Sequence, residues 1–148
     1  MRAGLILEDH SPTRKLLFDI MKTAFNEINL LQAVTISQAK KQVKAKGPDI
    51  AVVDINLPDG SGLEFVKYIT ETYSETYCIV TSVLDDERSI IGALEAGAKG
   101  YILKDESRDN LLKHFKDINK GKPPLSPAVC RKLVRWFNNN NLPIFYPT

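Results

Sequence analysis

The chain has 148 residues, of which 43% are hydrophobic and 26% charged, and its formal net charge is +2. This size and balance indicate one soluble globular domain with a short appendage, and exclude a disordered chain or a disulfide-stapled miniprotein. The charge is too small to indicate a nucleic-acid-binding surface on the chain as a whole.

The apolar run at residues 5–7 is too short for a signal peptide or a membrane span, so we expect a cytoplasmic protein without membrane contact. Cys78 and Cys130 lie far apart and lack metal-binding spacing, so we assign neither a role.

Strand-like and helix-like segments alternate along most of the chain. The strand-like segments are "GLILED", "INLLQAV", "DIAVVDI", "YCIVTSV" and "GYILK", and a helix-like segment follows each of them. In the first helix, "RKLLFDIMKTAF", the apolar residues recur at helical spacing and form one stripe. Because parallel neighbours need crossover connections, this alternation predicts an α/β, doubly wound parallel sheet with helices on both faces.

The composition changes after residue 121. Residues 122–148 contain a proline-rich break, a short amphipathic helix and an asparagine-rich tail, which we interpret as a linker beside the domain at residues 1–121. Val129, Leu133 and Phe137 are expected to share one face of the short helix, which suits packing on the domain or on a partner helix. The basic residues of this helix are interpreted as a solvated face rather than a DNA-binding patch.

Polar side chains follow four of the predicted strands. The first strand ends on Glu8 and Asp9, the third on Asp54, the fourth on Thr81 and Ser82, and the fifth on Lys104. Since the carboxyl ends of parallel strands meet at one edge of an open sheet, we expect these side chains to gather there. Three crowded carboxylates each need a proton or a cation, and hard oxygen ligands without His or Cys favour Mg²⁺.

Such a site suits phosphoryl transfer. A metal-bound phosphate beside Asp54 would make that carboxylate a nucleophile and give an aspartyl phosphate. Mg²⁺ and Lys104 would neutralise the charge on the phosphoryl oxygens, and Ser82 would donate a hydrogen bond to one of them. Each residue alone has a more ordinary interpretation as a cap, turn or surface residue, so the inference depends on the combination. His10 and His114 have no partners at metal-ligand spacing and receive no role.

The chain from about residue 1 to 121 resembles the receiver domain of two-component response regulators, most of all the NarL/FixJ (LuxR-type) branch. The matching motifs are "LILEDH", "DINLPDGSG" with D-x-x-x-P-x-x-x-G spacing, "IVTS" and "GAKGYILKD". The resemblance implies a flavodoxin-like (CheY-like) five-stranded sheet of order 2-1-3-4-5. It also implies that residues 1–121 form the receiver domain and residues 122–148 the linker.

The resemblance also implies the role of each site residue. Asp54 would be the phosphoacceptor, and Lys104 would pair with the phosphate. Ser82 would be the switch hydroxyl, and Tyr101 the aromatic residue whose rotamer reports the switch on the outer face. The Mg²⁺ ligands would be Glu8, Asp9, Asp54 and the backbone carbonyl of Asn56, and the phosphate contacts would come from Asn56, Val83 and Lys104.

Two positions depart from the family pattern. Receivers commonly have Lys-Pro with a cis peptide after the fifth strand, whereas this chain has Lys104-Asp105, which predicts a trans or strained bond because non-proline cis bonds are costly. Val83 stands where a small Ala or Gly is usual, and its bulk predicts slower access of a phosphodonor or of water to the site.

The expected function is a phosphorylation switch. A sensor histidine kinase would supply the phosphoryl group, and the receiver would catalyse only its own phosphorylation and dephosphorylation. The expected consequences are a homodimer and control of transcription through a DNA-binding domain missing from this chain, and the alternative is a stand-alone receiver that acts by protein contacts. A haloacid-dehalogenase-like phosphatase would need an acid where this chain has Asn56. A receiver-like module that is never phosphorylated would usually lack the acidic pair, Asp54 or Lys104.

Overall fold

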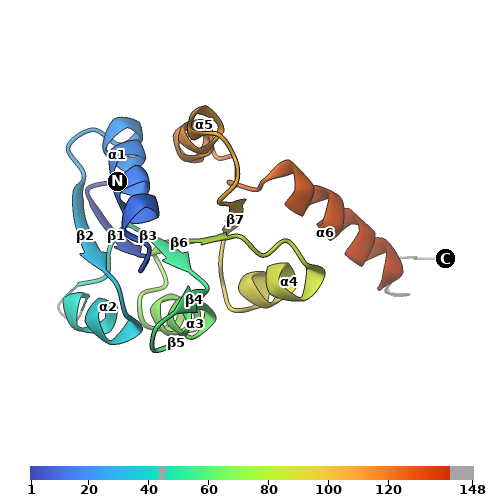
Figure 1. Cartoon of the computed structure of the whole chain (residues 1–148), viewed down its shortest axis with the longest axis horizontal. Coiled ribbons are helices and arrows are strands. Elements are labelled where there is room, and N and C mark those ends of the chain that lie inside the picture. The colour runs from blue at the N-terminus through green and yellow to red at the C-terminus, as the bar shows by residue number, and fades with distance from the viewer. Residues whose placement is uncertain (44–45, 141–148) are drawn as a thin grey trace.

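The computed structural model describes residues 1–43 and 46–140, and a five-stranded parallel sheet forms its centre (Figure 1). The strands occur in the order β2-β1-β3-β6-β7. Because β6 and β7 are the fourth and fifth strands of this sheet, the predicted order 2-1-3-4-5 is confirmed. The strands are β1 (Ala3–Leu7), β2 (Asn29–Ala33), β3 (Ile50–Asp54), β6 (Tyr77–Ser82) and β7 (Gly100–Leu103).

Helices cover both faces of the sheet, as the apolar strand sequences predict. Side chains that alternate along β1 show the two faces, since Leu5 and Leu7 pack into one cluster and Ile6 packs into the other. Helices α1 and α5 cover the Ile6 face, and helices α2, α3 and α4 cover the other. The helices are α1 (Ser11–Ala24), α2 (Ile36–Gln42), α3 (Gly62–Thr72), α4 (Glu87–Glu95), α5 (Arg108–Ile118) and α6 (Pro127–Asn139).

The central strand β3 is buried along its whole length, which fixes the position of its last residue, Asp54. It pairs with β1 on one side and with β6 on the other, so no edge of β3 is open to solvent. Such a strand has no polar face, because helices cover both sides of a parallel sheet. The apolar run before Asp54 therefore holds this carboxylate rigidly at the carboxyl edge of the sheet.

A small hairpin that the sequence did not predict follows β3. The strands β4 (Asn56–Leu57) and β5 (Gly60–Ser61) pair in antiparallel fashion. The Asp59 carboxylate at the turn accepts hydrogen bonds from the backbone N–H groups of Ile36 and Ser37, at 2.9 and 3.0 Å. These bonds tie the hairpin to the start of α2, so the loop beside Asp54 has a fixed shape.

The segment after α5 adds to the sheet. Leu125 forms a parallel bridge with Tyr101 beside β7, and Val129 of α6 is fully buried in the core. Helix α6 then packs on α4 and leads away past it (Figure 1). Leu133 is partly buried against the core, whereas Phe137 is 57% exposed. The predicted face therefore packs on the domain at Val129 and Leu133 and not at Phe137, where packing on a partner helix stays a prediction. Residues eight positions apart on a helix are rotated by about 80° from each other, which turns Phe137 away from the face of Val129.

The asparagine-rich tail from residue 141 onward lies outside the described residues. None of the helices within residues 1–43 and 46–140 is both long enough and apolar enough to cross a membrane.

Candidate functional site

Three carboxylates meet at the carboxyl edge of the sheet. Glu8 follows β1 and is fully buried, Asp9 beside it is exposed, and Asp54 ends β3 with 5% of its surface exposed. Each of the three offers an oxygen atom within 4.8 Å of the other two. The geometry thus brings together the acids that the strand ends predicted, and their all-oxygen ligand set fits Mg²⁺.

Lys104 reaches this cluster from the end of β7. Its Nζ lies 2.5 Å from Glu8 Oε1 and 3.1 Å from Asp54 Oδ2, and its side chain is 16% exposed. The Lys104 backbone N–H donates to the Ser82 carbonyl at 2.9 Å, which continues the pairing of β6 with β7. One ammonium group is therefore shared by two nearly buried carboxylates.

The protonation of Glu8 reflects this crowding. Burial, the largest cause, raises the pKa of Glu8 to about 6, and the charge of Asp54 adds to the rise. A hydrogen bond from Lys104 and one from the His10 backbone N–H, 3.1 Å from Oε2, lower the same pKa. An added cation at this site would favour the ionised carboxylate, because an opposite charge stabilises it.

The loop after Asp54 depends on a glycine. A Cβ atom at Gly62 would lie 1.8 Å from the Asp54 carbonyl oxygen, so no larger residue fits beside the end of β3. The Gly62 N–H donates to the Ile55 carbonyl at 2.6 Å, and α3 begins at this residue with Ser61 as its cap. This close approach explains the last position of the D-x-x-x-P-x-x-x-G motif. Asn56, whose carbonyl is a predicted metal ligand, begins β4 on the same loop.

The two predicted switch residues converge on one loop. The Ser82 Oγ accepts a hydrogen bond from the Leu84 N–H at 2.9 Å. The Tyr101 side chain is fully buried, and its hydroxyl donates to the Leu84 carbonyl at 2.6 Å. Val83, between Ser82 and Leu84 in the sequence, is 69% exposed. Its bulk is expected to limit the access of a phosphodonor or of water to the site. The described residues contain no cis peptide bond, so the Lys104-Asp105 bond is trans.

Several contacts at the site were not predicted from the sequence. Arg14 Nη1 donates to the Glu8 carbonyl at 3.0 Å, which links α1 to the acidic pair. His10 caps α1, since its ring nitrogen accepts from the Thr13 N–H at 3.4 Å. The contact of Arg14 could have been predicted, because a cation lies only five residues after the acidic pair, Glu8 and Asp9. The cap was harder to predict because Ser11, Pro12 and Thr13 offered more usual helix starts.

His114 also has a partner. Its Nε2 lies 3.0 Å from Glu106 Oε2, and the same carboxylate accepts a hydrogen bond from Ser126 Oγ. Glu106 precedes α5, His114 lies within that helix, and Ser126 is the N-cap residue of α6. These contacts attach the linker to the domain.

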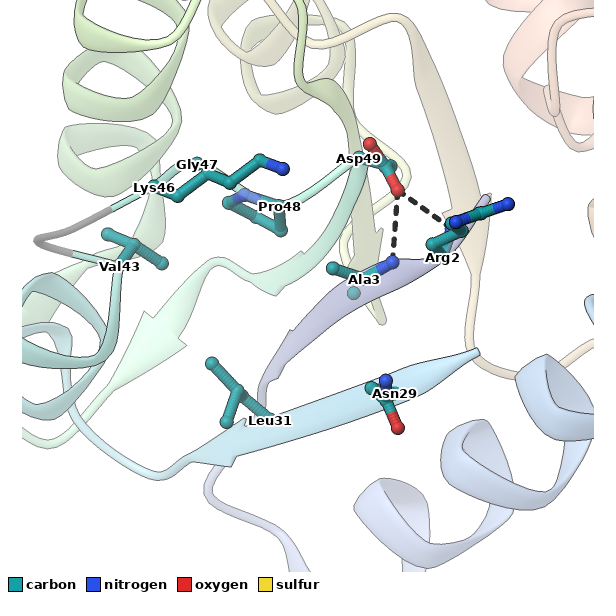
Figure 2. Close-up of a pocket in the computed structure, with 10 residues that line it drawn as sticks. Arg2, Ala3, Asn29, Leu31, Val43, Lys46, Gly47, Pro48 and Asp49 are labelled. Atoms are coloured by element: carbon teal, nitrogen blue, oxygen red, sulfur yellow. Dashed lines mark hydrogen bonds between the residues drawn. The ribbon is translucent and has the colours of Figure 1, made fainter. Parts of the chain in front are cut away.

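A hollow of about 370 Å³ lies at the opposite edge of the sheet (Figure 2). The Asp49 carboxylate at its rim accepts from the backbone N–H groups of Arg2 and Ala3, at 2.7 and 3.0 Å. Leu31 and Pro48 lie along the same hollow. None of the predicted site residues lines it, so the candidate site stays at the carboxyl edge.

Comparison with known proteins agrees with this geometry. Residues 5–116 match the family model of the response regulator receiver domain. The chain is 30% identical over 130 residues to the DNA-binding transcriptional activator DevR/DosR of Mycobacterium tuberculosis (strain ATCC 25618 / H37Rv), with 87% of this chain and 59% of that protein covered. It is 32% identical over 104 residues to the oxygen regulatory protein NreC of Staphylococcus carnosus (strain TM300), with 70% of this chain and 48% of that protein covered. The chain thus spans about half to three fifths of the length of these relatives.

Solved structures show the same fold. The BeF3-activated DrrB receiver domain has a TM-score of 0.72 at 25% identity, with 81% of this chain and 98% of that chain covered. A LuxR-family two-component response regulator from Aurantimonas sp. SI85-9A1 has a TM-score of 0.79 at 21% identity, with 90% of this chain and 96% of that chain covered. The family model covers most of the chain, including the end of β1 and the whole of β3, β6 and β7. The chain therefore belongs to the response regulator receiver domain family, in its NarL/FixJ (LuxR-type) branch.

Proposed function

We propose that this receiver works as a switch by accepting a phosphoryl group from a sensor histidine kinase on Asp54. The observation that supports this most is the position of the Asp54 carboxylate, which ends a buried strand 3.1 Å from Lys104 and beside two further acids. A nucleophile needs a fixed position, and a transferring phosphoryl group needs nearby positive charge. The Asp54 carboxylate has both a fixed position and a nearby positive charge.

In the proposed step an Asp54 carboxylate oxygen attacks the phosphorus atom of a phosphohistidine. The new oxygen–phosphorus bond forms as the phosphorus–nitrogen bond breaks. The electron pair of the broken bond stays on the imidazole nitrogen. Glu8, Asp9, Asp54 and the Asn56 carbonyl would hold Mg²⁺, which neutralises charge on the phosphoryl oxygens when bound. Lys104 is placed to pair with one of those oxygens. Water attack on the phosphorus later returns Asp54 as a carboxylate and resets the switch.

Phosphorylation would change the hydrogen bonds of the loop after β6. Ser82 would turn its hydroxyl toward the phosphoryl group and give up its contact with the Leu84 N–H. The Tyr101 hydroxyl, now bonded to the Leu84 carbonyl, would adjust with the same loop. A local charge change would thereby reach the outer face of the domain.

We propose that the output is transcription in the cytoplasm, through homodimerisation and a separate DNA-binding domain. The support comes from the relatives, since DevR/DosR is named as a DNA-binding transcriptional activator. A second candidate is a stand-alone receiver that acts by protein contacts, and the exposed apolar side chains of Val134 and Phe137 on α6 favour it. A haloacid-dehalogenase-like phosphatase is disfavoured, because Asn56 stands where that family needs an acid.

The central claim can be tested by mass spectrometry. The protein is incubated with Mg²⁺ and acetyl phosphate, and a mass gain of one phosphate is expected. Asp54→Asn should show no gain, whereas Asp19→Asn, a matched change at an exposed acid of α1, should behave as the wild type. An unmodified wild-type protein, or an unchanged gain in Asp54→Asn, would refute the assignment. Size-exclusion chromatography with light scattering on the same samples tests the homodimer.

A further inference from the structure

A side chain of helix α6 holds the loop that follows β6. Lys132 Nζ donates to the Asp85 backbone carbonyl at 2.5 Å and lies 3.4 Å from the Asp85 carboxylate. Asp85 belongs to residues 83–86, between β6 and α4, which we call the switch loop. A side chain of the linker helix therefore fixes the backbone of this loop.

The switch loop also contacts both predicted switch residues. The Leu84 N–H donates to Ser82 Oγ, and the Leu84 carbonyl accepts from the Tyr101 hydroxyl, at 2.9 and 2.6 Å. Leu84 and Asp85 are adjacent, so a movement that frees Ser82 from Leu84 also displaces the carbonyl that Lys132 holds. Lys132 thus contacts the residue next to Leu84, which is hydrogen-bonded to both predicted switch residues.

Only part of α6 is packed firmly. Val129 is fully buried and Leu133 partly, while Trp136 borders a hollow of about 430 Å³ beside α4. Helix α6 leads past α4 and away from the sheet (Figure 1). The Asp85 side chain is 62% exposed, and exposed ion pairs are weak. The Lys132 contact can therefore be broken at a small cost in free energy.

We infer that Lys132 is a positioning residue of the switch, which holds the switch loop in its unphosphorylated arrangement and couples that arrangement to the docking of α6 on α4. This inference rests on the proposed function, because it needs the rearrangement of Ser82. When Ser82 turns toward the phosphoryl group, Lys132 loses its acceptor and the end of α6 leaves α4. Without the Lys132 contact, a larger share of the unphosphorylated molecules has the switch loop in the arrangement that Ser82 needs for phosphoryl transfer, so loss of this contact also favours phosphorylation.

The chain contains its own reporter for this movement. Trp136 is the single tryptophan of the sequence and lies on α6 beside Glu87, Ile91 and Glu95 of α4. Its fluorescence and its quenching by acrylamide therefore report whether α6 is docked. The test variant is Lys132→Met, which keeps a long side chain and helix propensity, and the control is Arg131→Met at the exposed neighbouring position.

Acetyl phosphate with Mg²⁺ is expected to increase acrylamide quenching of Trp136 in the wild type and in Arg131→Met. Unphosphorylated Lys132→Met should already show increased quenching, and its initial phosphorylation rate should rise by about two- to fivefold, the range that an exposed ion pair supports. A purely structural role for Lys132 would leave that rate unchanged.

Mass spectrometry of the same samples separates the two possible failures. A fully phosphorylated wild type with unchanged Trp136 quenching would overturn the inference and leave the proposed function intact. The same holds if Lys132→Met matches Arg131→Met in both quenching and rate. A wild-type protein that gains no phosphate would overturn the proposed function, and the inference with it.

Discussion

The ionised form of Glu8 destabilises the folded protein, and the loss of stability can be measured. Burial raises the pKa of Glu8 from 4.5 to about 6. Between these pH values the folded protein binds more protons than the unfolded chain, so the contribution of Glu8 to stability falls as the pH rises from about 4.5 to about 6. The difference corresponds to about 2 kcal/mol lost at neutral pH. Replacement of Glu8 by Gln removes the charge and keeps an oxygen that can accept from the His10 N–H.

Glu8→Gln is therefore expected to be more stable than the wild type by about 2 kcal/mol at pH 7.5 without Mg²⁺. For a domain of this size the gain corresponds to an increase in Tm of about 4–8 °C. The gain should shrink as the pH is lowered from 7.5 to 4.5, because the wild-type carboxyl becomes protonated and equally neutral. Urea unfolding in EDTA across this pH range measures it, and Glu71→Gln at an exposed position is the control.

The reasoning fails if Glu8→Gln is no more stable than the wild type at pH 7.5, or if its advantage is as large at pH 4.5. Saturating Mg²⁺ provides a second measurement. A cation that binds only the folded protein stabilises it, and the ionised carboxylate is a better ligand than the amide. The difference between the two proteins should therefore decrease when Mg²⁺ is added, and an undiminished difference would argue against Glu8 as a ligand.

Three further predictions concern the rest of the domain. Gly62→Ala should destabilise the protein by about 3 kcal/mol in urea unfolding, because its Cβ would overlap the carbonyl oxygen at the end of β3, whereas Gly92→Ala in α4 should be neutral or stabilise it by up to about 1 kcal/mol. Equal effects would refute this. Val83→Ala should speed phosphorylation by acetyl phosphate, and an unchanged initial rate would show that its bulk does not limit access. A thiol reagent should label only Cys130 in the native protein, since burial raises the pKa of Cys78 to about 12, and fast labelling of both residues would contradict the buried position.

The arrangement of the site could be predicted because it follows from topology. Glu8, Asp54 and Lys104 each come directly after an apolar run, and parallel strands bring such ends to one edge. The sequence therefore predicted that these charges meet, without any knowledge of the distances. The distances of 2.5 and 3.1 Å from Lys104, and the pKa of Glu8, depend on side-chain packing that no spacing rule contains.

The parts that could not be predicted lack a local sequence pattern. The β4-β5 hairpin has strands of two residues each, which is too short to show an alternating pattern. The bridge from Leu125 to Tyr101 joins residues far apart in sequence, and the prolines around Leu125 indicated only a break in regular structure. The bonds from Asp59 to the start of α2 and the bridge at Leu125 are tertiary contacts, which local sequence patterns do not report.

The proline-rich segment holds the start of α6 on the domain independently of the switch loop. The Pro124 carbonyl accepts from the Tyr101 N–H at 2.9 Å, and the Ser126 N–H donates to the Tyr101 carbonyl at 3.1 Å. Ser126 Oγ also accepts from the Leu103 N–H at 2.8 Å, so this segment is held along β7 by three bonds that do not involve the switch loop. Pro124 itself has no N–H to offer, which suits an edge position and protects β7 from pairing with other chains. These bonds hold the chain as far as Ser126, the N-cap residue of α6, and Val129 in its first turn is fully buried. The movement proposed for α6 would therefore involve only its later turns and would leave the sheet edge covered.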